Sequence, residues 1–288
     1  MKPPRFEYAC PSTLEEALQL IESGEAKLLA GGQTLVPILN FRLAAPSLLV
    51  DINRIAGLDG LHVSDGRLHI GAMVRWRTIE RSSIVAAANP LLREAVRHIA
   101  HYQIRNRGTV GGSCAHADPA AEFPAIAVLC RADFVIERHG GMRIVPADQF
   151  FRGALTTALQ PHEMLTEIRF PPWPAGRNAA FEEIAPRHGD FAIAGAAVFV
   201  DCNAAGICCE AGIAVFGAAE RPQRLPDAEA LVTGRRIDTD AVDEAARIAT
   251  TNLEIQSDLH ASADYRRDVT RVLITRALRR AALAEAYA

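Results

Sequence analysis

The sequence lacks any long hydrophobic run, any strong charge imbalance and any recognisable targeting segment. Its apolar stretches stay well short of the roughly 20 residues that a helix needs to cross a bilayer. The formal net charge is -3, whereas proteins that bind nucleic acids or membrane surfaces usually carry a basic excess. The first residues also lack the continuous apolar segment of a secretory signal. We therefore expect a cytoplasmic protein that has no membrane span and binds no nucleic acid.

The six cysteines form no metal-binding pattern. No C-x-x-C pair is present, and no spacing matches the ligands of zinc or of an iron–sulfur cluster. In a reducing compartment such thiols are most simply small, buried apolar residues, and we expect no metal centre on this chain. The prediction of buried thiols applies to Cys10, Cys114, Cys130, Cys202, Cys208 and Cys209.

The apolar pattern that is present predicts an α+β protein built from three successive units, 1–57, 58–175 and 176–288. In the first unit, Ser12 and Glu15 form a capping box at the start of a helix. A strand, a helix and a second strand follow, in an order typical of a small α/β unit. These three elements are predicted at 27–30, 34–41 and 48–52.

The second unit combines two predicted hairpins with two helices and a closing strand. The stretch PPWPAG at 171–176 fits neither a helix nor a central strand, so it is predicted to end this unit. The third unit has two long apolar strands and two helices. In chain order, the elements of both units are predicted at 61–64, 68–71, 90–100, 120–129, 134–137, 142–145, 164–170, 194–201, 207–216, 238–252 and 264–286.

Two segments contain paired glycines, LLAGGQTLVP at 28–37 and RGTVGGSCAHADP at 107–119. Glycine lets a ligand or another backbone come close. Successive N–H groups that turn inward form an anion site, to which a helix N-terminus adds partial positive charge. Two such segments from adjacent units can hold one diphosphate from both sides, and Thr34, Thr109 and Ser113 can add hydroxyl donors.

The simpler interpretation is that each glycine pair only makes a turn. Neither segment matches G-x-G-x-x-G, which disfavours a Rossmann dinucleotide site, and neither matches the P-loop pattern of nucleotide hydrolases. The residues alone therefore favour a phosphate-bearing ligand held between two units, with a pair of turns as the alternative.

AGGQTL (30–35) together with RNRGTVGGSCAHADPAAE (105–122) resembles the two flavin-binding loops in the FAD subunit of molybdenum hydroxylases. That family includes carbon monoxide dehydrogenase and xanthine dehydrogenase. Residues 1–18, 181–198 and 262–278 resemble, in the same order, the family's opening, its third-domain entry and its C-terminal helix. The resemblance covers essentially the whole chain. It implies a two-part FAD-binding domain of the vanillyl-alcohol-oxidase type, followed by a small α+β domain.

The resemblance also implies which residues bind the cofactor. The two loops would enclose the FAD diphosphate, one carboxylate beyond them would accept hydrogen bonds from ribityl or ribose hydroxyls, and no residue would have a catalytic or metal-binding role. The implied loop residues are Ala30, Gly31, Gly32, Gln33, Thr34, Leu35, Gly108, Thr109, Gly111, Gly112 and Ser113. The implied residues beyond the loops are His116, Asp118, Glu122, Leu165 and Phe191.

Three of these residues have a plain structural alternative. In this alternative His116 is a hydrogen-bonded structural group. Asp118 is, in the same alternative, a residue at the start of a helix, before Pro119. Leu165 matches a position that lines the flavin in relatives. In the structural alternative it is a leucine in the core of a strand.

At two places the chain departs from some relatives. Phe191 stands where some relatives have tyrosine and others an aliphatic residue, so it can shield a flavin face but offers no hydroxyl. Glu182 and Glu183 stand near a position where some relatives have lysine. Because an acidic residue near the flavin disfavours its anionic reduced form, we assign no flavin contact to this pair.

The resemblance implies an electron-transfer subunit. A large partner would hold the molybdenum–pterin cofactor and hydroxylate the substrate with oxygen from water, and a small partner would hold two two-iron two-sulfur clusters. Electrons would pass through the clusters to FAD on this chain and then to an external acceptor, within a dimer of heterotrimers. The alternatives are a stand-alone FAD-dependent oxidase or reductase and a non-catalytic nucleotide-binding module.

Overall fold

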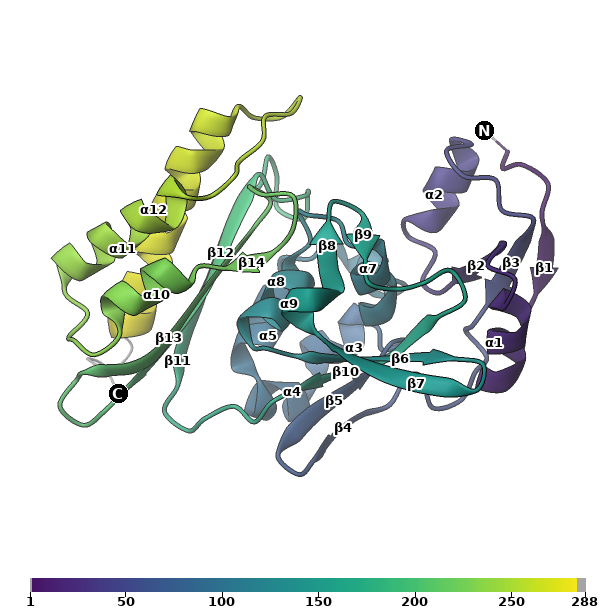
Figure 1. Ribbon diagram of the computed structural model, residues 1–288, viewed down its shortest axis with the longest axis horizontal. Coiled ribbons are helices and arrows are strands. Elements are labelled where there is room, and N and C mark those ends of the chain that lie inside the picture. The colour runs from purple at the N-terminus through teal and green to yellow at the C-terminus, as the bar shows by residue number, and fades with distance from the viewer. Residues whose placement is uncertain (1, 284–288) are drawn as a thin grey trace.

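The computed structural model describes residues 2–283 and shows three units arranged in a row (Figure 1). The N-terminal unit, drawn in purple, lies at one end, a five-stranded sheet lies in the middle, and helices α11 (Thr239–Thr251) and α12 (Ala263–Leu283) lie at the other end. The mixture of helices and strands confirms the predicted α+β class. The unit boundaries near residues 57 and 175 stay predictions.

The first unit is a three-stranded parallel sheet with two helices. Its first helix is capped by Thr13 and Glu16, one residue later than the predicted pair of Ser12 and Glu15. Both pairs have the capping-box spacing, but the Glu16 carboxylate accepts hydrogen bonds from the backbone N–H groups of both Ser12 and Thr13. The elements are β1 (Glu7–Ala9), α1 (Leu14–Ile21), β2 (Ala26–Leu29), α2 (Leu35–Asn40) and β3 (Leu48–Asp51).

The second unit is built on an antiparallel sheet in the order β4-β5-β10-β6-β7. Its strands are β4 (Leu61–Ser64), β5 (Arg67–Gly71), β6 (Asp133–Arg138), β7 (Gly141–Pro146) and β10 (Met164–Phe170), and β8 (Phe151–Gly153) and β9 (Thr156–Thr157) form a separate small pair. Its helices are α3 (Trp76–Arg81), α4 (Ser83–Ala88), α5 (Pro90–Val96), α6 (Tyr102–Arg105), α7 (Val110–His116), α8 (Glu122–Leu129) and α9 (Ala147–Phe150).

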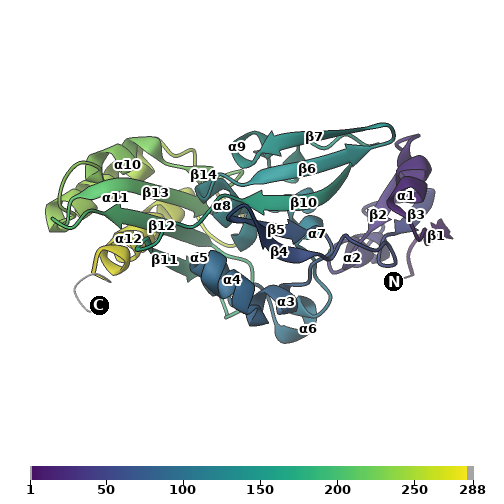
Figure 2. The same cartoon turned by 90° about the horizontal axis from the view of Figure 1, so that it is seen from below.

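The third unit is an antiparallel sheet in the order β11-β12-β13-β14. Helices α10, α11 and α12 cover its outer face, and the second unit covers its inner face (Figures 1 and 2). The remaining elements are β11 (Asn178–Ile184), β12 (Ala194–Cys202), β13 (Cys208–Phe216), β14 (Gln223–Arg224) and α10 (Pro226–Val232).

Helix α8 joins the second and third units in one hydrophobic core. Every residue of this helix is buried, and the helix packs against β12, β13 and β14. The same core contains Phe181, Phe199 and Phe216 from the inner face of the third sheet, together with Leu68 and Phe170 from the middle sheet. Apolar packing therefore fixes the position of the third unit against the second.

Most predicted elements are confirmed, with shifted ends. Both hairpins of the second unit are present, and β10 has the predicted bounds. Strands β1, β8, β9, β11 and β14 and helices α3, α4, α6, α7, α9 and α10 were not predicted. The helix predicted at 90–100 ends at Val96, and the positive φ of 45° at Ala100 shows that the predicted last residue is not helical. The last predicted helix extends to 283, and its predicted end at 284–286 lies outside the described residues.

The cysteine prediction is right for three of the six positions. Cys114, Cys130 and Cys208 are buried, Cys10 and Cys202 are half-buried, and Cys209 is exposed. Among residues 2–283, no cluster of three or more histidine, cysteine, aspartate or glutamate side chains is arranged to hold a metal ion. No helix in the same range is long and apolar enough to span a bilayer.

The shared core predicts that Phe216 stabilises the whole chain. Its ring is fully buried and stacks on Phe181 at 5.5 Å between centroids. Phe216→Ala should lower the free energy of unfolding by about 3–5 kcal/mol, because it opens a cavity in the core. Urea unfolding of the purified chain measures this change. The exposed Phe41 is the control, and Phe41→Ala should change stability by less than about 0.5 kcal/mol. Equal changes in the free energy of unfolding for the two variants would contradict the stabilising role of Phe216 in the shared core.

Candidate cofactor site

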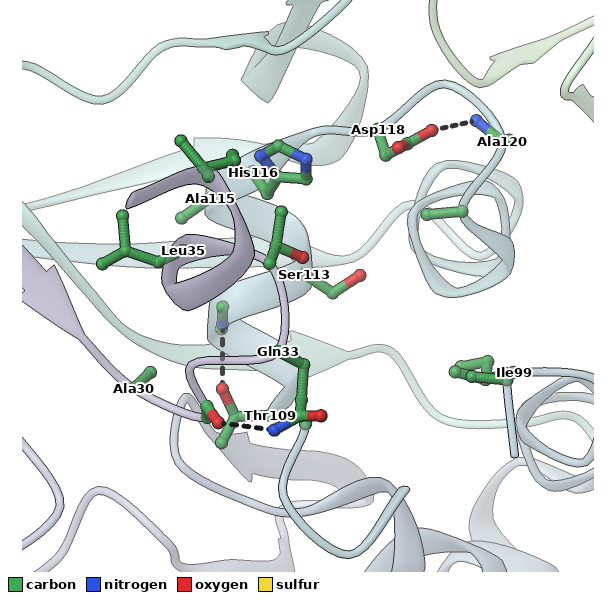
Figure 3. Close-up of a pocket in the computed structure, with 18 of the residues that line it drawn as sticks. Ala30, Gln33, Leu35, Ile99, Thr109, Ser113, Ala115, His116, Asp118 and Ala120 are labelled. Carbon is green, nitrogen blue, oxygen red and sulfur yellow. Dashed lines mark hydrogen bonds between the residues drawn. The ribbon is translucent and has the colours of Figure 1, made fainter. Parts of the chain in front are cut away.

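A cavity of about 1280 Å³ lies where the three units meet. The segment 30–35 of the first unit and the segment 108–122 of the second unit form two of its walls (Figure 3). Another wall comes from the third unit and consists of Pro186, residues 189–193, Gly217, Asp258, His260 and Arg266. All sixteen predicted binding residues line this one cavity. Its volume exceeds the ~300–1000 Å³ typical of small-molecule pockets, so the cavity suits an extended ligand.

The first glycine segment presents a run of unused backbone donors. Within residues 2–283, the N–H groups of Gly31, Gly32, Gln33 and Thr34 form no hydrogen bond with another group of the chain. Gly32 has a φ of 72°, which glycine adopts without strain. The Gln33 side chain donates to the carbonyl oxygen of Gly31 at 3.2 Å and so ties the loop to itself. Consecutive free N–H groups of this kind form an anion-binding concavity.

The second glycine segment is a short helix rather than an open loop. Thr109 caps α7, and its hydroxyl oxygen accepts a hydrogen bond from the N–H of Gly112 at 3.2 Å (Figure 3). The N–H of Gly111 donates to the carbonyl oxygen of Ala72, and that of Ser113 donates to Thr109. The amide cradle predicted for this segment is therefore wrong for these three groups, because the chain itself uses their donors.

Close packing explains why glycine, which has no Cβ atom, occupies two of these positions. A Cβ atom on Gly111 would overlap Ala72, and a Cβ atom on Gly31 would overlap the carbonyl oxygen of Arg107. Because Gly31 and Arg107 come from the two different segments, the missing side chain lets the segments touch.

Arg75 and Asn53 hold the two segments together. The Arg75 guanidinium donates to the carbonyl oxygen of Arg107 and, at 2.5 Å, to Oδ1 of Asn53. The Asn53 side-chain amide donates in turn to the carbonyl oxygen of Ala30 at 2.9 Å. Neither residue stands in a recognisable motif, so sequence reasoning had no signal by which to find this link.

Ser113, His116 and Asp118 face the cavity from α7 and the turn after it (Figure 3). Among the described residues, neither the Ser113 hydroxyl nor the His116 ring has a hydrogen-bond partner, so no contact within the described chain supports the alternative of a hydrogen-bonded structural histidine. One oxygen of Asp118 accepts the N–H of Ala120 at 2.9 Å and shapes the turn before α8. The structural alternative, a residue at the start of a helix, is wrong, because α8 begins only at Glu122 and Asp118 lies in the turn before it.

Glu122 is the most deeply buried charged residue predicted for the site. It opens α8, is only 7% exposed and lines the cavity. Burial, together with the nearby carboxyls of Glu183 and Asp118, raises the pKa of Glu122 to about 8. Its side chain accepts no hydrogen bond from another described residue.

Leu165 and Phe191 differ strongly in environment. Leu165 is 4% exposed and belongs both to the hydrophobic core and to the cavity wall. A role in the strand core is therefore compatible with a position that lines the flavin. Phe191 is 68% exposed at the edge of the same cavity.

Arg266 is a wall residue that sequence reasoning missed. It is buried on α12, and its guanidinium donates to the carbonyl oxygens of Ile193 and Gly217 and to Asp258, each at 2.5 Å. A signal was available, because Arg266 shares a helix face with the buried Thr270 and Leu273 at spacings of four and seven residues.

The site as a whole suits a long ligand with a phosphate group and a flat apolar part. Free N–H groups and hydroxyls gather at the glycine segments, and the rest of the wall includes Met73, Trp76, Ile104, Met164 and Leu165. A dinucleotide such as FAD has these chemical parts.

Comparison with known proteins identifies the class. The family described as "FAD binding domain in molybdopterin dehydrogenase" matches residues 4–173, and the family described as "CO dehydrogenase flavoprotein C-terminal domain" matches residues 179–281. The chain therefore belongs to the family of FAD-binding medium subunits of molybdopterin-dependent dehydrogenases.

The chain is similar to individual members over almost its full length. It is 40% identical to the 6-hydroxypseudooxynicotine dehydrogenase complex subunit alpha of Paenarthrobacter nicotinovorans, over 98% of this chain and 96% of that protein. Among solved structures, carbon monoxide dehydrogenase from Hydrogenophaga pseudoflava aligns with a TM-score of 0.94 and 41% identity, covering 98% of each chain. Quinoline 2-oxidoreductase from Pseudomonas putida 86 aligns with a TM-score of 0.95 and 37% identity, covering 100% of each chain. A stand-alone oxidase or reductase is not favoured.

The link through Arg75 predicts that this residue supports FAD binding without lining the cavity. Arg75→Gln should weaken FAD binding about tenfold, or about 1.4 kcal/mol, which is close to the contribution of one hydrogen bond to a charged group. Fluorescence titration of the apo-protein with FAD measures the affinity. The neighbouring exposed Arg54 is the control, and Arg54→Gln should leave the affinity unchanged. Unchanged affinity in Arg75→Gln would refute a supporting role for the link.

Proposed function

We propose that this chain holds one FAD in the cavity between its two glycine segments and relays electrons from iron–sulfur clusters of a small partner subunit to an external acceptor. The large partner holds the molybdenum–pterin cofactor and the substrate. The observation that supports the FAD site most directly is the run of free N–H groups from Gly31 to Thr34 on the wall of a cavity of about 1280 Å³.

The chain's own residues bind and orient the cofactor. The free N–H groups of 31–34 face the diphosphate, and the close contact of the two segments brings the Ser113 hydroxyl to the same part of the cavity. Asp118 keeps one oxygen available for a ligand hydroxyl, since only its other oxygen is used in the turn. Bound FAD supplies a ring system that accepts and returns electrons.

The third unit closes the cavity from its other side. Arg266 fixes the backbone at Ile193 and Gly217, and so holds the segment that contains Phe191 at the edge of the cavity. Phe191 shields one face of the flavin by apolar contact and leaves that edge open to an acceptor. Tested acceptors should include oxygen, NAD, a quinone and a cytochrome.

The assembly that we propose is a dimer of heterotrimers, each with this chain, the large molybdenum subunit and the small iron–sulfur subunit. Relatives named as medium chains or as subunits of a dehydrogenase complex support a multi-subunit assembly. The cytoplasmic location stays a prediction from the sequence.

Reconstitution tests the proposed relay. The chain alone should bind FAD in equimolar amount, and a substrate of the complex should bleach the flavin absorbance only when both partner subunits are present. Reduction of the flavin by a small organic substrate without partners would instead support the stand-alone oxidase or reductase. Absence of flavin from the chain at every stage would support the non-catalytic module.

The Ser113 hydroxyl gives a sharper test of the site. Ser113→Ala should weaken FAD binding about 2- to 12-fold, the range expected for one lost hydrogen bond of ~0.5–1.5 kcal/mol. The melting temperature of the apo-protein should not change, because this hydroxyl has no hydrogen-bond partner among the described residues. Ser64→Ala, on the exposed end of β4, is the matched control. Wild-type affinity in Ser113→Ala would show that the hydroxyl does not contact FAD.

A further inference from the structure

The third unit reaches the cofactor cavity through the ends of two neighbouring strands. Ile193 lies just before β12 and Gly217 lies directly after β13, and both residues line the cavity. The register pairs Gly195 with Phe216, so these two strand ends lie side by side. A Cβ atom on Gly217 would come within 3.0 Å of the carbonyl oxygen of Ala192, so the two backbones are in close contact there. The two ends therefore form one continuous part of the cavity wall.

Arg266 of α12 binds both strand ends at once. One terminal nitrogen of its guanidinium donates to the carbonyl oxygens of Ile193 and Gly217, and the other donates to Asp258, each at 2.5 Å. Arg266 is only 5% exposed, and Asp258 balances its charge. A planar guanidinium holds several acceptors in fixed directions, whereas an ammonium group is a single flexible point charge. The side chain therefore fixes the two strand ends relative to α12.

Gly217 extends this connection to the FAD-binding domain. Its N–H group donates to the carbonyl oxygen of Pro119 at 2.8 Å. Pro119 follows Asp118 in the turn between α7 and α8, and Asp118 has one carboxylate oxygen that no described residue uses. A hydrogen-bonded path thus runs from Arg266 in the third unit, through Gly217, to the residue next to Asp118.

The position of Asp118 matters because a hydrogen bond to a ligand depends on accurate placement of both groups. A binding site that is loose by about 1 Å loses much of its function even when all of its residues are present. A turn that becomes ordered only when the ligand arrives also lowers the affinity, because the entropy of ordering is lost at that moment. The path from Arg266 orders the turn before the ligand binds.

We propose that Arg266 is a positioning residue for the cofactor: through Gly217 and Pro119 it holds Asp118 in the geometry that accepts a hydroxyl group of FAD. The inference rests on the proposed FAD site, because it assigns the free oxygen of Asp118 to that ligand. It adds that helix α12 of the third unit controls a contact that the second unit makes with the cofactor.

The first experiment is a double-mutant cycle on FAD affinity, measured by fluorescence titration of the apo-chain. Arg266→Lys keeps the charge but not the fixed geometry of the three hydrogen bonds. It should raise the dissociation constant about fivefold, which lies within the range of coupling between residues of one hydrogen-bond network. In an Asp118→Ala background the same substitution should raise it by less than about twofold, because the contact that Arg266 positions is already absent.

The next residue of the helix, Arg267, provides the matched control. Its guanidinium also donates to backbone carbonyl oxygens, those of Thr250 and Leu253, but Arg267 does not line the cavity. Arg267→Lys should leave the dissociation constant of FAD within about twofold of the wild-type value. An equal loss of affinity in Arg266→Lys and Arg267→Lys would mean that the stability of α12, and not the position of Asp118, controls FAD binding.

Hydrogen exchange tests the same path without FAD. The Gly217 amide is bonded to Pro119, so it should exchange slowly in the wild-type apo-chain. Arg266→Lys should speed its exchange about fivefold, and Arg267→Lys should not. Asp258→Asn is a milder second variant, because the Asp258 side chain is half-exposed and Arg266 stays in place. It should shift both the exchange rate and the FAD affinity in the same direction as Arg266→Lys, to a smaller extent.

The outcomes distinguish the two proposals. An effect of Arg266→Lys on FAD affinity that is the same with and without Asp118 would overturn the positioning role, as would wild-type affinity in Asp118→Ala or unchanged exchange of the Gly217 amide in Arg266→Lys. Failure of the wild-type chain to bind FAD would overturn the proposed cofactor site instead. Hydrogen exchange would then still decide whether Arg266 holds the turn, because that measurement requires no ligand.

Discussion

The packing of α8 between the middle sheet and the third sheet is the constraint on which the rest of the structure depends. This helix is buried along its whole length and has no polar face of its own. It contacts β12, β13 and β14 on one side and joins a core that reaches Leu68 and Phe170 in the middle sheet. Because α8 follows directly from the second glycine segment, its burial also fixes α7 and the turn at Asp118 against the cavity.

The glycine pairs illustrate how one residue type serves two different needs. Gly31 and Gly111 are required by contacts within the chain, since a side chain at either position would overlap the backbone or side chain of another segment. Only the first segment leaves consecutive N–H groups free for a ligand. In the second segment the N–H groups of Gly111, Gly112 and Ser113 donate to Ala72 and Thr109, so this segment contributes shape and a hydroxyl. The diphosphate site that we propose is therefore asymmetric.

Local patterns in the sequence, such as apolar periodicity and turn residues, correctly predicted those helices and strands whose ends are set by neighbouring residues. The hairpin at Asp65-Gly66 and the strand 164–170 have clear periodicity and turn residues, and both are present. Strand β11 and helix α7 were missed because their formation depends on distant partners. Strand β11 pairs with β12 and packs on α12, and the glycine-rich α7 is held by Thr109 and by Ala72, the residue after β5.

The sequence by itself determined the α+β class, the family and the set of residues that could meet a flavin, because these follow from ordered motifs and local periodicity. Only the tertiary structure decided how those residues act together. The tertiary structure brought all sixteen predicted binding residues to the wall of one cavity. It linked the two glycine segments through Arg75 and Asn53, and it placed Arg266 of the third unit on another wall of that cavity. Such contacts depend on how buried faces pack, and no spacing along the sequence specifies them.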